Sequence, residues 1–224
     1  MNELLNQTSI KINDKVFLKN PESSNLGRNI ISESIFLINE LGFEKFTFRK
    51  LSNKIGSTES SIYRYFENKH KVLLYLTSWY WCWLEYQLVF KTVNTKDPQE
   101  KLKTAIELLT QTAKQDSNYS YINESVLHKV VIAESSKLYH TQEVDSDNKD
   151  GLFLVYKRLV HRVSVMVLEL NPNYEYSHML ISTVIEGAHQ QKHFALHLPK
   201  LTDTQDGEKG ITHFFTQVVF SSIS

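Results

Sequence analysis

The sequence predicts an all-α protein of about nine helices, and three observations lead to this prediction. Apolar residues recur at steps of three and four along most of the chain, which places them on one face of a helix. No segment alternates apolar and polar residues over the length of a strand. The 224 residues include only 7 Gly and 4 Pro, so turns are few and regular elements are long. Hydrophobic residues make up 41% of the chain, which is enough for a packed core.

The first predicted helices are short and have clear ends. Residues 1–25 are polar and weakly periodic, and we expect a flexible or loosely docked arm there. The helical pattern begins at Leu26 and stops at Gly42. Thr47 is well placed to cap a short helix that ends at Gly56. Thr58 then offers an N-cap for a second short helix over the segment ESSIYRYF.

The remaining helices are longer. Two polar loops, TQEVDSDNKDG and TDTQDGEKG, interrupt the helical pattern of this part of the chain. The helices are expected over about 69–93, 98–113, 119–139, 152–170, 174–198 and 208–222.

Composition limits the classes of protein that the chain can belong to. Cys82 is the sole cysteine, which rules out an intramolecular disulfide and fits a reducing compartment. The first residues have no apolar signal-peptide region, and no run of about 18 apolar residues is present. We therefore expect a cytoplasmic protein.

Charge is distributed unevenly although the formal net charge is zero. Residues 26–71 carry eight basic and five acidic side chains, a balance of +3. Residues 72–224 carry 14 basic and 17 acidic side chains, a balance of −3. A mildly basic N-terminal module on a mildly acidic body is a weak indication of contact with an anionic partner.

The two short helices between Thr47 and Phe66 are joined by Gly56, Ser57 and Thr58. Helices this short are marginal alone and must pack on each other and on the helix before them. This arrangement is a helix-turn-helix, whose second helix fits a DNA major groove ~12 Å wide. A helix corner without any DNA role has the same spacing, so the spacing alone leaves both interpretations open.

The residues of this segment resemble the TetR family of bacterial transcriptional regulators. The resemblance covers about residues 26–75 and has no gap. The matching residues are Thr47, Leu51, Ser52, Gly56, Thr58, Ile62, Tyr63, Tyr65, Phe66 and Lys69. It implies a helix-turn-helix DNA-binding domain over 26–71 and a helical ligand-binding and dimerisation domain over 72–224.

The sequence departs from the family pattern at three positions. Ser57 replaces the usual aliphatic residue of the turn, and Ser60 stands where Gly or Pro is common. Glu59 places an acid at the start of the second helix. There it either stabilises the helix dipole or accepts a hydrogen bond from a cytosine amino group.

Donors and positive charge near helix N-termini suit phosphate contacts. Thr47 caps the first short helix, and Arg49 has the reach for a phosphate or a base edge. The resemblance implies that Tyr63 and Lys69 contact phosphates. For Arg49, Lys50 and Arg64, an ordinary solvated charge is the alternative. The full set of predicted DNA-contacting residues is Thr47, Arg49, Lys50, Thr58, Glu59, Ser60, Ser61, Tyr63, Arg64, Tyr65 and Lys69.

The resemblance also implies a homodimer that binds a palindromic DNA operator through two half-sites. In the family, the last two long helices form the dimer surface. Small residues here allow close helix packing, either between chains or within one chain, and the aromatic final helix would expose much apolar surface in a monomer. The predicted interface residues are Thr183, Gly187, Ala188, Phe214, Phe215 and Val218.

The sequence gives little information about the effector, and we expect a small apolar or amphipathic molecule. Trp79, Trp81 and Trp83 cannot share one helix face, because residues 79 and 81 point about 160° apart. At least one of them faces solvent, a neighbouring helix or a pocket. Polar side chains could supply polar points in an apolar cavity, although an ordinary packing role is the alternative for each. The predicted pocket residues are Trp83, Tyr86, His128, Tyr156 and His161.

Two rival functions are considered. A helical di-metal carboxylate enzyme needs two Glu-x-x-His motifs on different helices. Glu175–His178 and Glu186–His189 have this spacing but lie about 16 Å apart on one predicted helix, so they cannot share a centre. Glu186, His189 and His193 could hold one metal by themselves. The other rival is an interaction protein that keeps the fold without binding DNA.

We therefore expect a ligand-responsive transcriptional regulator, a repressor by family habit, with neither a cofactor nor an enzymatic activity. The effector would favour a state whose recognition helices are wrongly spaced for the operator. The helix that begins near Lys69 would transmit the change.

Overall fold

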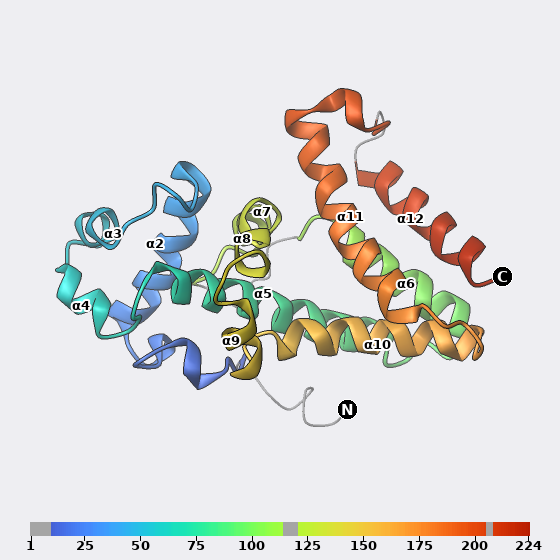
Figure 1. The fold of residues 1–224 in the computed structure, drawn as a ribbon, viewed down its shortest axis with the longest axis horizontal. Coiled ribbons are helices and arrows are strands. Elements are labelled where there is room, and N and C mark those ends of the chain that lie inside the picture. Colours follow the sequence, from blue (N-terminus) through green and yellow to red (C-terminus); the bar gives the residue numbers. More distant parts are fainter. Residues whose placement is uncertain (1–9, 114–120, 205–207) are drawn as a thin grey trace. The chain divides into compact units, whose positions relative to one another are not determined.

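The computed structural model describes residues 10–113, 121–204 and 208–224. Within these ranges the chain forms eleven α-helices, α2 to α12, and three short 3-10 helices, η1 to η3. No strand occurs among these residues. The predicted all-α class is therefore confirmed (Figure 1). The described helices number two more than the expected nine, because the helix expected over 119–139 is divided into α7 and α8, and because α9 lies where a loop was expected.

The chain divides into two compact units. The helix-turn-helix unit holds Lys11–Tyr80 and Ala113–Leu154. The C-terminal unit holds Trp81–Thr112 and Val155–Ser224, together with Met1–Ile10. Helix α5 contributes residues to both. The functional division into residues 26–71 and 72–224 remains a prediction, because the two units describe only which residues pack together.

The helix-turn-helix unit contains most of the short elements. Helix α2 packs against η2, α3 and α7, and α3 packs against α4. The bounds are η1 Asp14–Val16, η2 Pro21–Ser23, α2 Asn25–Leu41, α3 Phe48–Ile55, α4 Glu59–Tyr63, α5 Lys69–Thr92, α7 Glu124–Glu134, α8 Ser136–Tyr139 and α9 Val144–Lys149.

Residues 1–25 were expected to form a flexible or loosely docked arm, and residues 1–9 lie outside the described part of the chain. The described remainder packs on the unit: Val16 and Pro21 are buried, and the backbone N–H of Leu18 donates to the carbonyl of Tyr65 at 2.8 Å. At Gly27 a Cβ would lie 2.1 Å from the carbonyl oxygen of Pro21. Only glycine therefore permits this close approach of η2 to α2.

The predicted caps of α3 and α4 are present. The Thr47 hydroxyl accepts a hydrogen bond from the N–H of Lys50, and the Thr58 hydroxyl accepts one from Ser61. Gly56 ends α3 in the left-handed conformation at φ 64°, which costs glycine little. These local signals fix both ends of α3 and the start of α4, which ends at Tyr63 rather than at the expected Phe66.

The region after α6 departs from the sequence pattern. A single helix was expected over 119–139, of which 119 and 120 are outside the described residues. The Asn123 side chain caps α7 at its N-terminus, and the helix ends at Glu134, after which Ser136 begins α8. The expected polar loop over 141–151 contains α9, whose Asp147 is buried. Ion pairs of this aspartate stabilise a turn of helix that has no apolar stripe.

The C-terminal unit is built from the long helices. Helices α6, α11 and α12 pack against one another (Figure 1). The bounds are α6 Pro98–Thr110, α10 Leu154–Leu170, α11 Ser177–His197, η3 Pro199–Leu201 and α12 Glu208–Ser222.

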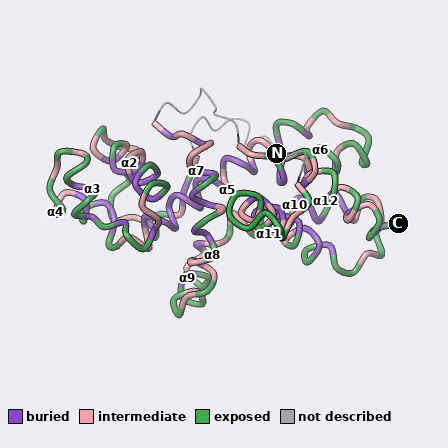
Figure 2. Tube along the Cα trace, turned by 90° about the horizontal axis from the view of Figure 1, so that it is seen from above, coloured by how far each residue is buried: buried purple, intermediate pink, exposed green. Residues whose placement is uncertain are grey.

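Helix α5 is the most buried long element, as the purple trace in Figure 2 shows. Trp79, Trp81 and Trp83 are all buried, although they point in different directions around the helix. Apolar contacts on every side explain why α5 lacks the one-sided pattern of a surface helix. No helix in the described ranges is both long and apolar enough to cross a membrane.

Candidate nucleic-acid interface

Helix α3 separates its core residues from its charged residues. Phe48, Leu51 and Ser52 are buried against the unit. Arg49 and Lys50 lie on the opposite, exposed face. One turn of helix therefore presents two positive charges next to the capped N-terminus, where unpaired backbone N–H groups also favour an anion.

Helix α4 is five residues long and is held by a single apolar anchor, Ile62. Its cap gathers hydroxyls: the Thr58 Oγ1 lies 3.1 Å from the Ser60 Oγ and 2.9 Å from the Ser61 Oγ. Glu59 and Ser60 are exposed. The exposed surface of α3 and α4 appears in green in Figure 2.

Tyr63 and Arg64 complete the exposed surface at the end of α4. Tyr63 is 50% exposed, and its ring packs edge-on against Phe48 with 4.9 Å between ring centroids. A guanidinium nitrogen of Arg64 lies 3.5 Å from the Ser61 hydroxyl, which leaves this exposed side chain weakly held. The two residues are thus positioned by α3 and α4 while remaining open to a partner.

Tyr65 does not share this surface. It is only 3% exposed, and its hydroxyl is hydrogen-bonded to the Ser24 hydroxyl at 2.7 Å. The bond to Ser24 lowers the pKa of Tyr65, although burial acts in the opposite direction. Because Ser24 also caps α2, Tyr65 ties the end of the recognition segment to the start of α2. Its role in the structure is internal.

Lys69 is also engaged within the protein. Its ammonium donates to the backbone carbonyls of Phe43 at 3.0 Å and Glu44 at 3.1 Å. It also lies 4.7 Å from the centre of the Phe43 ring. Lys69 therefore ties the first turn of α5 to the loop before α3.

Helices α7 and α8 hold the same loop from another direction. The carboxylate of Glu134 accepts a hydrogen bond from the N–H of Phe43 at 3.0 Å. Lys137 pairs with Glu134 at 2.7 Å and with Glu44 at 3.2 Å. Burial acts to lower the pKa of Lys137, but its bonds to the two glutamates outweigh this and raise it. Helical spacing gave no signal for Glu134, because the contact depends on the fold.

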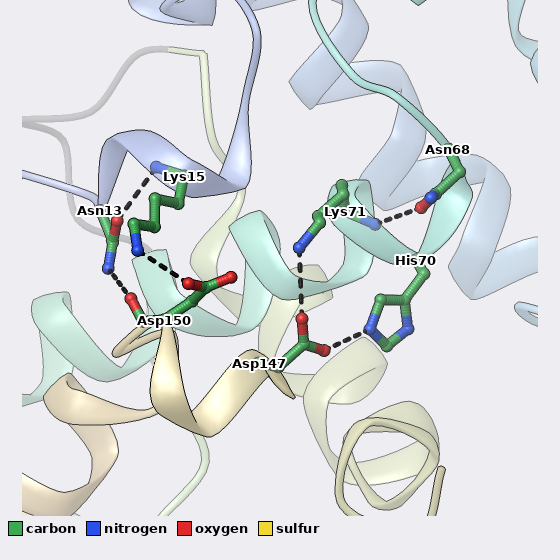
Figure 3. Close-up of polar contacts among 7 residues, drawn as sticks. All are labelled: Asn13, Lys15, Asn68, His70, Lys71, Asp147 and Asp150. Atoms are coloured by element: carbon green, nitrogen blue, oxygen red, sulfur yellow. Dashed lines mark hydrogen bonds and ion pairs between the residues drawn. The ribbon is translucent and has the colours of Figure 1, made fainter. Parts of the chain in front are cut away.

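The start of α5 is held by α9, and the end of α9 is in turn held by the N-terminal segment (Figure 3). The buried carboxylate of Asp147 accepts from His70 at 2.7 Å and from Lys71 at 3.2 Å. Asn13 donates to the carbonyl of Asp150 at 3.0 Å, and Lys15 pairs with the Asp150 carboxylate at 2.7 Å.

Two further exposed lysines, which were not among the predicted contacts, belong to the same charged face. Lys54 lies one turn after Lys50 on α3, and Lys45 lies just before the helix. The carbonyl of Lys45 accepts a hydrogen bond from the Lys50 ammonium at 2.8 Å. The four-residue step from Lys50 to Lys54 is a signal that could have identified the second of them.

The predicted effector-pocket residues are divided between the two units. His128 is buried in the helix-turn-helix unit, where its Nδ1 lies 2.6 Å from the Tyr80 hydroxyl. Trp83, Tyr86, Tyr156 and His161 belong to the C-terminal unit. The Tyr156 ring stacks on Trp81, with 4.5 Å between centroids.

A cavity of about 500 Å³ lies in the C-terminal unit between α5, α6 and α10. Of the five predicted pocket residues, its lining includes only His161. Charged residues Lys101, Arg162 and Glu169 also line it. The apolar part of the lining is Leu88, Val89, Val93, Val165 and Met166.

The predicted dimer residues fall into two groups. Thr183 and Phe214 are exposed and Val218 is half-buried. Ala188 and Phe215 are buried within the chain. At Gly187 a Cβ would lie 2.7 Å from the Phe215 ring, so this glycine allows α11 and α12 of one chain to approach closely.

The three residues considered for a metal have other surroundings. Glu186 accepts a hydrogen bond from the Tyr156 hydroxyl at 2.6 Å. His189 is buried and stacks on Trp81, and its burial lowers the pKa to about 3. The His193 ring contacts His197 instead, with 4.6 Å between centroids. Within the described ranges, no group of three metal-ligating side chains has the geometry to hold an ion.

Comparison with known proteins supports the assignment of the N-terminal helices. Residues 30–76 match the family model of bacterial regulatory proteins, tetR family. A search of curated protein sequences gave no significant match.

Three solved structures share the fold over most of the chain. Superantigen PfiT has a TM-score of 0.59 at 14% identity, covering 91% of this chain and 97% of its own. The fatty acid degradation regulator FadR from Bacillus halodurans has a TM-score of 0.57 at 18% identity, covering 84% and 96%. A structure described as the molecular basis for control of antibiotic production by bacterial hormones has a TM-score of 0.59 at 10% identity, covering 89% and 98%.

At these identities the structural likeness concerns the fold alone, and one fold can carry several functions. The family match is more specific, because it falls on the caps, the turn and the two short helices described above. Residues 30–76 therefore carry the N-terminal domain of the tetR family of bacterial regulatory proteins, and the chain as a whole shares its fold with the regulator FadR.

Proposed function

We propose that this protein is a transcriptional repressor that binds a palindromic operator as a homodimer and is released by a small amphipathic effector. The observation that carries the proposal is the exposed surface of α3 and α4. It combines the positive charges of Arg49, Lys50 and Arg64 with the hydroxyls of Ser60 and Tyr63. We expect the protein to work in the cytoplasm, where DNA is accessible.

The proposed contacts differ in what they recognise. Arg49 and Lys50 lie in the first turn of α3, and the ring of Tyr63 packs against Phe48 of the same turn. We assign these three side chains to phosphate contacts. Ser60 and Arg64 flank the exposed face of α4, and we assign them to base edges in the major groove. Glu59 either accepts from a cytosine or stabilises the α4 N-terminus. Thr47, Thr58 and Ser61 act mainly as caps, and Tyr65 and Lys69 position the segment from inside.

A dimer fits the small size of α4, because five residues of helix read few base pairs. The exposed stripe on α11 contains Met179, Thr183, Glu186 and Gln190, at helical spacing. Exposed Phe214 on α12 adds an aromatic side chain. We place the partner subunit on this stripe, with Val218 at its edge, whereas Gly187, Ala188 and Phe215 shape the packing beneath it.

Release requires that effector binding changes the position of α3 and α4. The loop before α3 is held by Lys69 from α5 and by Glu134 from α7. A movement of either helix would therefore shift this loop and the helix that follows it. The similar FadR structure is described as a fatty acid degradation regulator, which is consistent with control by a small organic molecule.

The experiment is selection of bound fragments from genomic DNA with the purified full-length protein. Binding to the recovered operator is then measured for Arg49→Ala, Tyr63→Phe and Arg64→Ala. Each variant that loses a phosphate contact should weaken binding and reduce the salt slope by about one. Lys91→Ala removes an exposed lysine elsewhere on α5 and is the matched control.

The outcomes separate the alternatives. If the three variants bind as the wild type does while their circular dichroism is unchanged, the interface is assigned to the wrong surface. If no DNA is enriched, the protein is an interaction protein that keeps the fold. Stoichiometric iron or zinc in the purified protein would instead favour the metal-enzyme alternative.

A further inference from the structure

The cavity of the C-terminal unit has one continuous apolar wall. Leu88 and Val89 come from α5, and Val165 and Met166 come from α10. Leu88, Val89 and Met166 are buried, whereas Val165 is 40% exposed and stands where the cavity opens. The volume of about 500 Å³ lies within the range of small-molecule sites.

The polar part of the same cavity carries an excess of positive charge. Arg162 binds the carboxylate of Glu85 through its Nε, and Arg158 binds the same carboxylate through Nε at 2.8 Å. Glu85 is fully buried. Two guanidinium groups thus share one carboxylate, which leaves this cluster with a charge of about +1.

The Arg162 guanidinium has hydrogen-bond donors that the bond to Glu85 does not use. Its bond to Glu85 is its only hydrogen bond to any residue in the described ranges. The two terminal amino groups of its guanidinium therefore remain for solvent or a ligand. Because Glu85 fixes the Nε, the fork is already oriented before a ligand arrives.

The other two charged residues of the lining, Lys101 and Glu169, carry opposite charges. Lys101 pairs with Glu169 at 3.1 Å. His161 is hydrogen-bonded to His178, with 3.1 Å between ring nitrogens. The charge that a ligand would have to match is therefore that of Arg162.

We propose that this cavity binds a monocarboxylate with an apolar body, whose carboxylate rests on Arg162 and whose body lies against Val89, Val165 and Met166. A planar guanidinium fork matches a carboxylate in shape, and one excess positive charge matches a monoanion. The proposal rests on the proposed effector-controlled function, because it names the class of the effector. It also moves the site away from Trp83, Tyr86 and Tyr156.

The test is calorimetric titration of the full-length protein with straight-chain carboxylates from butanoate to dodecanoate. Decanol and decyl phosphate serve as uncharged and dianionic analogues. We expect saturable binding of one carboxylate per chain that strengthens with chain length, with decanol weaker by at least about tenfold.

Two arginine variants form a matched pair. Arg162→Gln removes the fork at the cavity and should weaken carboxylate binding about ten- to hundredfold. Arg158→Gln removes the excess positive charge of the cluster but leaves the lining and the Arg162 fork intact, so it should weaken binding less than Arg162→Gln does. Val165→Trp keeps every charge and fills the opening, so it should abolish binding even if Arg162→Gln fails to fold.

Several results would overturn the proposal: no saturable binding of any carboxylate in the series, equal effects of the two arginine variants, unimpaired binding to Val165→Trp, or binding of decanol or decyl phosphate as tight as that of decanoate.

DNA binding is measured in parallel, so that the proposed carboxylate site and the proposed effector control are tested separately. Carboxylate binding that leaves operator affinity unchanged refutes effector control but supports the site. Operator release by another molecule without carboxylate binding refutes the site alone.

Discussion

The two units of this protein each contain a buried carboxylate with two basic partners, yet the two clusters differ in chemistry. In the C-terminal unit, Glu85 accepts four hydrogen bonds from Arg158 and Arg162. In the helix-turn-helix unit, Asp147 accepts one bond each from His70 and Lys71 (Figure 3). Both clusters join α5 to a helix that is distant in sequence.

A buried carboxylate between two basic side chains therefore serves two different purposes in this protein. Both arginine partners of Glu85 stay charged at every relevant pH, and Arg162 keeps donors for the cavity. The Asp147 cluster closes a short helix, α9, onto α5, and none of its three members lines the cavity of the C-terminal unit. We therefore expect the Glu85 cluster to matter for both stability and binding, and the Asp147 cluster for local order.

Replacing the Glu85 carboxylate with an amide should have the largest effect. Glu85→Gln removes the charge that four hydrogen bonds need, and we expect a loss of about 2–4 kcal/mol in the free energy of unfolding. Urea denaturation followed by circular dichroism measures it. Glu169→Gln, in the partly exposed pair with Lys101, is the control and should cost much less. A loss below about 1 kcal/mol for Glu85→Gln would contradict the importance of the cluster.

His189 should make the stability of the C-terminal unit depend on pH. Its burial lowers the pKa from 6.5 to about 3, so the unfolded chain binds a proton that the folded chain cannot accept. Stability is therefore lost as the pH falls below 6.5, at up to about 1.4 kcal/mol per pH unit.

Between pH 7 and pH 5, the wild type should lose up to about 2 kcal/mol relative to His189→Gln. Urea denaturation at several pH values measures the difference. His213→Gln changes an exposed histidine of α12 and should keep the wild-type dependence. If His189→Gln and the wild type show parallel pH profiles, His189 does not carry this effect.

Asp147→Asn should destabilise the protein less than Glu85→Gln, by about 1 kcal/mol, because fewer hydrogen bonds are lost. The hydrogen-exchange rates of the α9 amides should rise by a larger factor than the equilibrium constant for global unfolding, since the cluster holds α9 locally. Asp145→Asn alters an exposed acid of the same helix and is the control. Equal exchange in the two variants would show that the ion pairs do not hold α9.

Lys15→Ala should have the smallest effect. Its pair with Asp150 is exposed, although the hydrogen bond from Lys15 lowers the pKa of the aspartate. Water and salt screen such a pair, so the urea midpoint should not change measurably. A clear shift in the midpoint would mean that the N-terminal segment contributes more to stability than its exposed contacts indicate.

Sequence reasoning was most successful where the cause is local. Thr47, Gly56 and Thr58 act within one turn of their own position, so residue type and spacing were sufficient to place both ends of α3 and the start of α4, whereas α4 ends at Tyr63, before the expected Phe66. Tyr65 and Tyr63 have the same chemistry in sequence, but a contact with Ser24, 41 positions away, buries only Tyr65. Their different surroundings could not be read from spacing.

The remaining features depend on contacts across the fold. Glu134 meets Phe43 only because α7 packs against α2. Helix α9 looked like a loop because ion pairs of Asp147 replace the apolar stripe by which helices are recognised. The predicted pocket favoured aromatic residues, whereas the cavity is lined by aliphatic side chains together with polar and charged ones, among them Arg162.

The contact between Gly187 and Phe215 has a consequence for how this protein tolerates change. Gly187 is only half-buried, and a scan that ranks positions by exposure would treat it as permissive. The ring of Phe215 is itself buried and has little room to move when a methyl group is added at position 187. In a library of random variants, position 187 should therefore be depleted as strongly as a core position, even when the replacement is alanine.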